Sequence, residues 1–149
     1  MWNDKRSIGL SKVCILLFMS LLVAIAVFAP WLTRWFLGFS RAELAGVGNL
    51  FLATIYAGFI PAAYLLYSLF GLLRRIEAEQ VFITLNVEVL RRISWCCFAG
   101  AGIGLFSACY YFPWFFVAVA AAFMGLIVRV VKNVMAKAVE LQNEVDYTV

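Results

Sequence analysis

The sequence predicts an all-α membrane protein with four transmembrane helices in two antiparallel hairpins. Of its 149 residues, 66% are hydrophobic and 13% are charged, whereas a soluble domain carries about 45–50% apolar and about 25% charged residues. One long polar interval, residues 74–92, divides the chain into two apolar halves, and an Arg-Arg pair stands at each of its ends. We call this interval the elbow, and we expect a single four-span domain over residues 1–149, with a cytoplasmic amphipathic elbow and a C-terminal helical extension.

The first span is predicted at about residues 11–32. Its uncharged run, Val13 to Ala29, follows a basic segment and approaches the roughly 20 residues that a membrane-spanning helix needs. A cleaved signal peptide is the alternative, because Ala24-Ile25-Ala26 fits a small-residue cleavage site. The apolar core of a signal peptide has only about 7–15 residues, so the length of the run favours an uncleaved span.

The second span is predicted at about residues 46–73. Ser40-Arg41-Ala42-Glu43 has the pattern of a helix capping box, which predicts a helix that begins there and continues through Gly46 to the elbow. Pro61 lacks a backbone N–H and is expected to bend this helix. Its polar side chains have two interpretations: they hydrogen-bond neighbouring helices, or they form a face for an apolar ligand; they are Asn49, Tyr56, Tyr64 and Tyr67.

The third and fourth spans are predicted at about residues 93–112 and 114–132. Only a short aromatic segment separates them, so they should form a tight hairpin. Gly100 and Gly104 make a small-xxx-small pair, a spacing that lets two helices approach closely in lipid. The same small-residue faces make a homo-oligomer a further expectation.

The tail, residues 133–149, is predicted to continue the fourth helix out of the membrane. Apolar residues recur there at the alternating spacing of four and three that coiled coils use: Ile127, Val131, Val134, Ala138, Leu141 and Val145. The acidic residues of the tail complement the arginines of the elbow. We therefore expect the tail to dock on the elbow, with the membrane surface as the alternative.

The distribution of positive charge predicts the orientation. Of the twelve Lys and Arg residues, only Arg34 and Arg41 lie in the two loops opposite the elbow. Lys and Arg are retained on the cytoplasmic side of a membrane. The expected location is the bacterial cytoplasmic (inner) membrane, with the elbow and both termini in the cytoplasm.

Several functions lack the residues that they require. The chain has no His, which removes the commonest metal ligand and general base. Its four Cys form no CxxC pair, and no ionisable residue lies deep within a span, where a proton-coupled transporter would need one. A basic face on a soluble module is also missing, so no direct nucleic-acid partner is expected. We therefore predict a protein without enzymatic activity, cofactor or metal, whose immediate partner is the lipid bilayer.

Two motifs resemble a known family. The elbow contains Val81-Phe82, Asn86-Val87 and Leu90-Arg91-Arg92-Ile93, and the tail contains the run Ala138 to Val149. Together they are similar to the bacterial multi-pass membrane family labelled domain of unknown function 2975, over roughly residues 50–149. The resemblance implies a four-span protein of unassigned function, often encoded beside a small helix-turn-helix regulator, and it implies no catalytic residues.

The predicted function is regulatory or scaffolding: the elbow and the tail would dock a cytoplasmic partner, for which the resemblance suggests the helix-turn-helix regulator. The predicted docking residues are Phe82, Asn86, Arg91, Arg92, Leu141, Glu144 and Asp146. The alternative is a membrane-embedded binder of a lipid or an apolar antimicrobial, as in an immunity protein. Its predicted ligand face is Asn49, Tyr56, Tyr64 and Tyr67.

Overall fold

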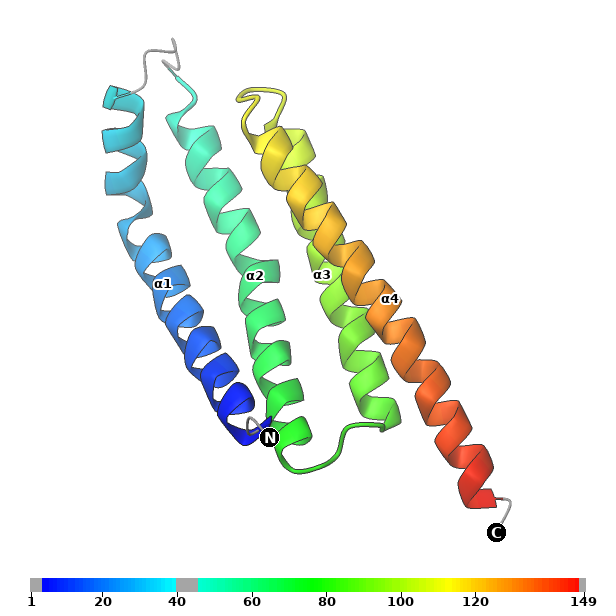
Figure 1. Cartoon of the computed structure of the whole chain (residues 1–149). Coiled ribbons are helices and arrows are strands. Elements are labelled where there is room, and N and C mark those ends of the chain that lie inside the picture. The colour runs from blue at the N-terminus through cyan, green and yellow to red at the C-terminus, as the bar shows by residue number, and fades with distance from the viewer. Residues whose placement is uncertain (1–3, 40–45, 148–149) are drawn as a thin grey trace.

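The computed structural model describes residues 4–39 and 46–147, and these ranges contain four helices and no strand. They are α1 (Asp4–Phe39), α2 (Gly48–Glu77), α3 (Thr84–Ser107) and α4 (Trp114–Tyr147) (Figure 1). Each is long and apolar enough to cross a membrane. The prediction of an all-α chain with four potential spans is confirmed.

The four helices stand in a row in chain order (Figure 1). α1 packs on α2, α2 on α3, and α3 on α4, with the most extensive contact between α3 and α4. The α2–α3 link, the start of α1 and the end of α4 lie at one end of the row, which we call the elbow end. The α3–α4 loop lies at the opposite end.

Large apolar side chains cover the outside of the row. Phe18, Ile60, Phe106 and Phe123 are all exposed, and each comes from a different helix. Exposed apolar surface of this extent is not tolerated by a soluble monomer. Lipid is the solvent that these faces require, because apolar side chains in contact with hydrocarbon avoid the free-energy cost of exposure to water.

The elbow is not a separate helix. α2 continues to Glu77, residues 78–83 form the link, and α3 begins at Thr84. α2 ends in a Schellman motif, in which the N–H of Gln80 bonds the Arg75 carbonyl at 2.9 Å and the N–H of Glu79 bonds the Ile76 carbonyl at 3.0 Å. The amphipathic pattern of the elbow therefore belongs to the first turns of α3.

The beginning of α2 differs from the prediction. Gly46 has a φ of 91°, which is outside the helical region, and the helix begins at Gly48. A side chain at Gly48 would meet Leu37 at 3.3 Å, so this start packs closely on the end of α1. A helix that runs continuously from residue 41 is therefore wrong; the capping box at Ser40 to Glu43 lies outside the described residues.

α3 and α4 approach most closely at two glycines. A Cβ at Gly104 would lie 3.0 Å from the Cβ of Ala118 and 3.1 Å from its backbone nitrogen. A Cβ at Gly125 would lie 3.1 Å from Cys97, and the Ser94 hydroxyl donates to the Gly125 carbonyl at 3.2 Å. Nothing lies within 4 Å of a Cβ at Gly100. Of the predicted glycine pair, only Gly104 is part of this interface.

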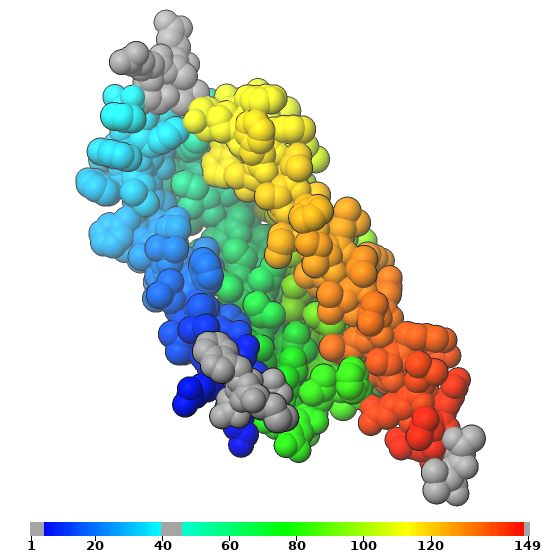
Figure 2. Space-filling view, viewed as in Figure 1, coloured from blue at the N-terminus to red at the C-terminus, as the bar shows by residue number. Residues whose placement is uncertain are grey.

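α4 runs well past the start of α3. Its 34 residues extend about 50 Å, against about 30 Å for the hydrocarbon core of a bilayer. Because Gly104 lies opposite Ala118, the antiparallel register places Thr84 opposite Ala138. Residues 140–147 are exposed, and Figure 2 shows the end of α4 projecting from the row.

Only the first residues of the tail lie beside the elbow, since Ala138 is opposite Thr84, and the docking predicted for the acidic end of the tail is not seen among the described residues. Leu141 is 50% exposed, because the register carries it past the first residue of α3. Arg91 and Arg92 pair with Glu88 of their own helix, at 3.4 and 3.9 Å, and Glu140 pairs with Lys137 at 3.4 Å. Of the apolar positions predicted to form a docking seam, Ala138 is half-buried and the other five are exposed.

We predict that Gly104→Leu separates α3 from α4, whereas Gly100→Leu is tolerated. The first substitution places a side chain against the backbone of Ala118, and overpacking of this kind costs about 1–3 kcal/mol. Thermal unfolding of the two purified variants in detergent measures the difference. Equal melting temperatures would show that the close approach at Gly104 does not hold the helices together.

Candidate functional site

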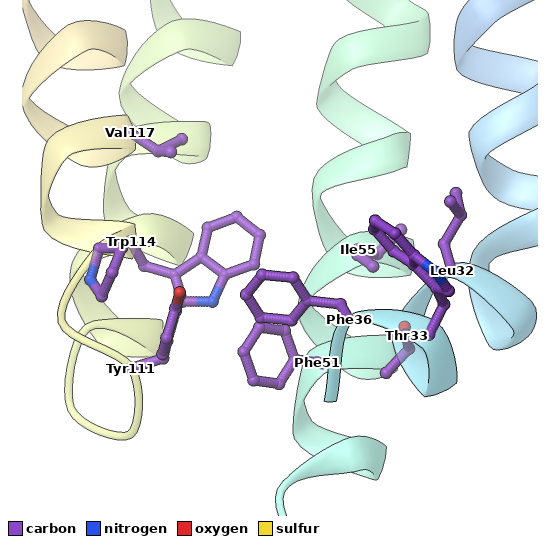
Figure 3. A pocket seen from close by; sticks show the side chains of 10 residues that line it. Leu32, Thr33, Phe36, Phe51, Ile55, Tyr111, Trp114 and Val117 are labelled. Carbon is purple, nitrogen blue, oxygen red and sulfur yellow. The ribbon is translucent and has the colours of Figure 1, made fainter. Parts of the chain in front are cut away.

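An aromatic cleft opens at the end of the row opposite the elbow, between α1, α2 and the start of α4 (Figure 3). Its volume is about 410 Å³. The lining side chains are almost all apolar or aromatic, and they come from segments far apart in the sequence: Leu32, Thr33, Trp35, Phe36, Phe51, Ile55, Tyr111, Pro113, Trp114 and Val117.

Phe51 is the centre of the cleft wall. Its ring, 5% exposed, lies 5.8 Å from that of Phe36, 5.1 Å from Tyr111 and 6.1 Å from Trp114, between ring centroids. Phe36 also meets Tyr111 edge to face at 5.8 Å. Tilted and edge-to-face contacts of this kind are favourable beyond the area that they bury, and here they join α1, α2 and the α3–α4 loop.

Two polar atoms in this apolar wall have no hydrogen-bond partner among the described residues. They are the hydroxyl of Thr33, a side chain only 5% exposed, and the indole N–H of Trp114. Figure 3 shows them on either side of the Phe36 and Phe51 rings. An unsatisfied buried polar group costs about 1–3 kcal/mol, and neighbouring side chains cover both atoms, so a partner reaches them only when those side chains shift.

Hydrogen bonds between helices hold the walls in position. Pro30 has no N–H, so it leaves the carbonyl of Ala26 without its helical donor, and the Tyr56 hydroxyl of α2 donates to that carbonyl at 3.1 Å. Between α2 and the end of α3, the Thr54 and Ser107 hydroxyls lie 2.8 Å apart, and Thr54 also bonds the Tyr110 hydroxyl. The cleft is therefore built on helices that polar contacts fix relative to one another.

Comparison with known families gives one match. A family model described as "Protein of unknown function (DUF2975)" matches residues 31–149. The chain belongs to the DUF2975 family. The family resemblance seen in the elbow and the tail is thereby confirmed, and the matched region begins before α2, earlier than expected. No curated protein and no solved structure matches the chain.

The ligand face predicted for this DUF2975 protein is not one site. Asn49 is exposed at the start of α2, Tyr56 bonds α1, and Tyr64 and Tyr67 line a different groove near the elbow. The four positions point to similar sides of the helix, but about 27 Å of helix axis separates the first from the last. For Tyr56, the interpretation as a bond between helices is the one that the structure supports.

The predicted docking residues divide into two groups. Phe82, Arg91, Arg92, Leu141, Glu144 and Asp146 are exposed. Asn86 is 0% exposed, and its amide group donates to the carbonyls of Gln80 and Val81 at 2.7 and 2.8 Å. Its amide oxygen accepts from Arg75 Nε at 2.7 Å. Asn86 therefore holds the α2–α3 link from inside and presents nothing to a partner, so its place in the docking set is wrong.

The described residues of this DUF2975 protein contain no cluster of three or more His, Cys, Asp or Glu that could hold a metal ion. The site that sequence reasoning missed is the cleft itself. Part of its wall comes from the short aromatic segment between the third and fourth spans, which supplies Tyr111, Pro113 and Trp114. Thr33 gave the one local signal, since it is a hydroxyl within the aromatic stretch that follows Pro30.

We predict that Tyr56→Phe destabilises the chain only while Pro30 is present. In the Pro30→Ala variant a backbone N–H again reaches the Ala26 carbonyl, so the loss of the tyrosine hydroxyl should cost nothing there. The coupling in this double-mutant cycle should be about 0.6 kcal/mol, the average for such bonds in membranes, measured by unfolding in detergent. Additive effects would contradict the assigned role of Tyr56.

Proposed function

We propose that this protein is a non-enzymatic binder embedded in the membrane, and that its ligand is a largely apolar molecule with a hydrogen-bond acceptor. Lipids and apolar antimicrobials belong to this class, and the second would make it an immunity-type protein. The observation that carries the proposal is the pair of unpartnered polar atoms, Thr33 Oγ1 and Trp114 Nε1, in the wall of the aromatic cleft.

The chemistry of the two groups defines the ligand. An indole N–H only donates, whereas a threonine hydroxyl donates and accepts. After a small shift of the side chains that cover these atoms, a ligand with an ester, ketone or amide oxygen therefore satisfies Trp114 or Thr33, while its apolar body packs on Phe36, Phe51 and Ile55. A volume of about 410 Å³ falls within the range of about 300–1,000 Å³ typical of small-molecule sites.

The orientation that we propose places this cleft where such a ligand arrives. The elbow end carries most of the Lys and Arg residues, which favours a cytoplasmic elbow and cytoplasmic termini in a bacterial inner membrane. The cleft, at the opposite end of the row, then lies near the outer surface. A molecule that enters the outer leaflet meets it before it reaches the cytoplasm.

We expect the full chain in nanodiscs to bind methyl laurate in the cleft. A diazirine analogue of this ester should label Phe51 or its neighbours after irradiation, as mapped by mass spectrometry. Methyl laurate should compete with the label, and dodecane, which has no acceptor, should compete about fivefold less, because one hydrogen bond of about 1 kcal/mol is missing.

Thr33→Val keeps the shape of the cleft, Trp114→Phe keeps an aromatic ring in a slightly larger cleft, and each removes one polar group. Each should weaken competition by methyl laurate about threefold to tenfold. Tyr67→Phe is the matched control, because Tyr67 lies outside the cleft and should have no effect. Labelling that is spread along the helices, or that both cleft variants leave unchanged, would refute the proposal.

Docking of a cytoplasmic partner is a second candidate function, and the projecting end of α4 favours it. Leu141 and Val134 are exposed, on a helix that continues past the start of α3. In this proposal the partner is the small helix-turn-helix regulator, which would contact the tail and the exposed elbow residues Phe82 and Arg91.

A bacterial two-hybrid assay between the full chain and a small helix-turn-helix regulator tests this second candidate. Truncation after Lys137 and Leu141→Lys should both abolish the signal, because they remove the projecting apolar surface. Phe123→Ala, which changes an exposed residue in the middle of α4, should preserve it. An unchanged signal in the truncated chain would eliminate docking through the tail.

A further inference from the structure

A second, chemically different groove lies between α2 and α3 at the elbow end. Its volume is about 290 Å³, and its walls are far more polar than those of the aromatic cleft. Three arginines line it, Arg74, Arg75 and Arg92, together with the hydroxyl-bearing side chains Tyr64, Tyr67 and Ser68. We call it the arginine groove.

Arg75 is held in place by neutral groups. Its Nε donates to the amide oxygen of the fully buried Asn86 at 2.7 Å, and Asn86 is itself oriented by its two bonds to the carbonyls of the link. The rest of the guanidinium lies along α2, within 3.5 Å of where a Cβ of Gly71 would stand. An amide orients the side chain but leaves its positive charge uncompensated.

The other two arginines add to this positive charge. Among the described residues, no carboxylate lies within 4 Å of Arg74. Arg92 has one long contact, 3.9 Å from Nε to Glu88 Oε1, and Glu88 is shared with Arg91 at 3.4 Å. The nearby carboxylate of Glu77 pairs with Lys12 of α1. Among the residues that the structure describes, three guanidinium groups of the groove thus have one carboxylate partner, Glu88, which Arg91 shares.

The apolar residues of the groove indicate that the bound anion is attached to a hydrocarbon chain. Leu85, half exposed, and Val89 form part of the wall beside the arginines. The groove lies at the elbow end, where the apolar helices meet their polar connection and a bilayer has its headgroups. An anion with an attached hydrocarbon chain satisfies both parts of this lining.

We propose that the arginine groove binds the phosphate group of an anionic phospholipid. Guanidinium groups match phosphate oxygens through paired, charge-assisted hydrogen bonds, and basic pockets between membrane helices bind such headgroups. Tyr64, Tyr67 and Ser68 supply further hydroxyl donors, and the acyl chains extend along Leu85 and Val89. This site is separate from the aromatic cleft, and it does not depend on the function proposed for that cleft.

Native mass spectrometry of the full chain in a neutral detergent tests the assignment. Phosphatidylglycerol should be retained more tightly than phosphatidylcholine, whose choline cancels the phosphate charge. Arg74→Gln and Arg92→Gln should each weaken phosphatidylglycerol retention about tenfold, as expected for loss of a charge-assisted hydrogen bond. Arg34→Gln, outside the groove at the opposite end of the row, is the matched control and should retain the lipid normally.

Further measurements distinguish a lipid phosphate from free phosphate, and they test whether misfolding of a variant explains weaker lipid retention. Inorganic phosphate at millimolar concentration should not displace phosphatidylglycerol; displacement would assign the groove to a free anion and overturn the lipid assignment. Tyr67→Phe changes no charge and should weaken retention about threefold without lowering the melting temperature. Undiminished retention in the Arg74→Gln/Arg92→Gln double variant would refute a phosphate site altogether.

Discussion

The polar contacts between α2 and α3 hold the two halves of the molecule together. In a bilayer, apolar side chains are solvated equally well by lipid and by a neighbouring helix, so the hydrophobic effect does not drive helices together. Close packing and hydrogen bonds must join them instead. The Thr54 and Ser107 hydroxyls do this at one end of the interface, and the Arg75–Asn86 bond does it at the other. Because α1 packs on α2 and α4 packs on α3, this one interface sets the position of every helix in the row.

The two candidate sites lie at opposite ends of that interface, and their chemistry follows from where they lie. Near the α3–α4 loop, Phe51 gathers aromatic rings from three segments into a wall with two polar atoms. Near the link, the end of α2 places Arg74 and Arg75 beside the start of α3. About 35 Å of helix axis separates Phe51 from Arg74, so each site meets a different surface of the bilayer.

The sequence was informative wherever structure depends on local properties of the chain. In lipid, a helix satisfies its own backbone hydrogen bonds, so four apolar runs suffice to predict four helices. The sequence pattern did not show which residues far apart in the chain contact one another. Nothing near Thr33 indicates that Trp114 shares its cleft. The polar character of Asn86 suggested a surface residue, although it is buried by partners on the preceding link. The start of α2 was misplaced because Gly46 adopts a conformation that the capping pattern did not indicate.

Pro30 divides α1 into a long segment and a short one, and every residue that α1 contributes to the cleft follows it: Leu32, Thr33, Trp35 and Phe36. Figure 1 shows α1 changing direction in its second half. The missing backbone bond accounts for the bend, and the Tyr56 hydroxyl of α2 supplies the donor that the Ala26 carbonyl lacks. A ligand of the proposed class dissolves in the hydrocarbon and reaches the cleft from there. Its occupancy follows its concentration in the bilayer, which its partition coefficient sets, and no longer its concentration in water.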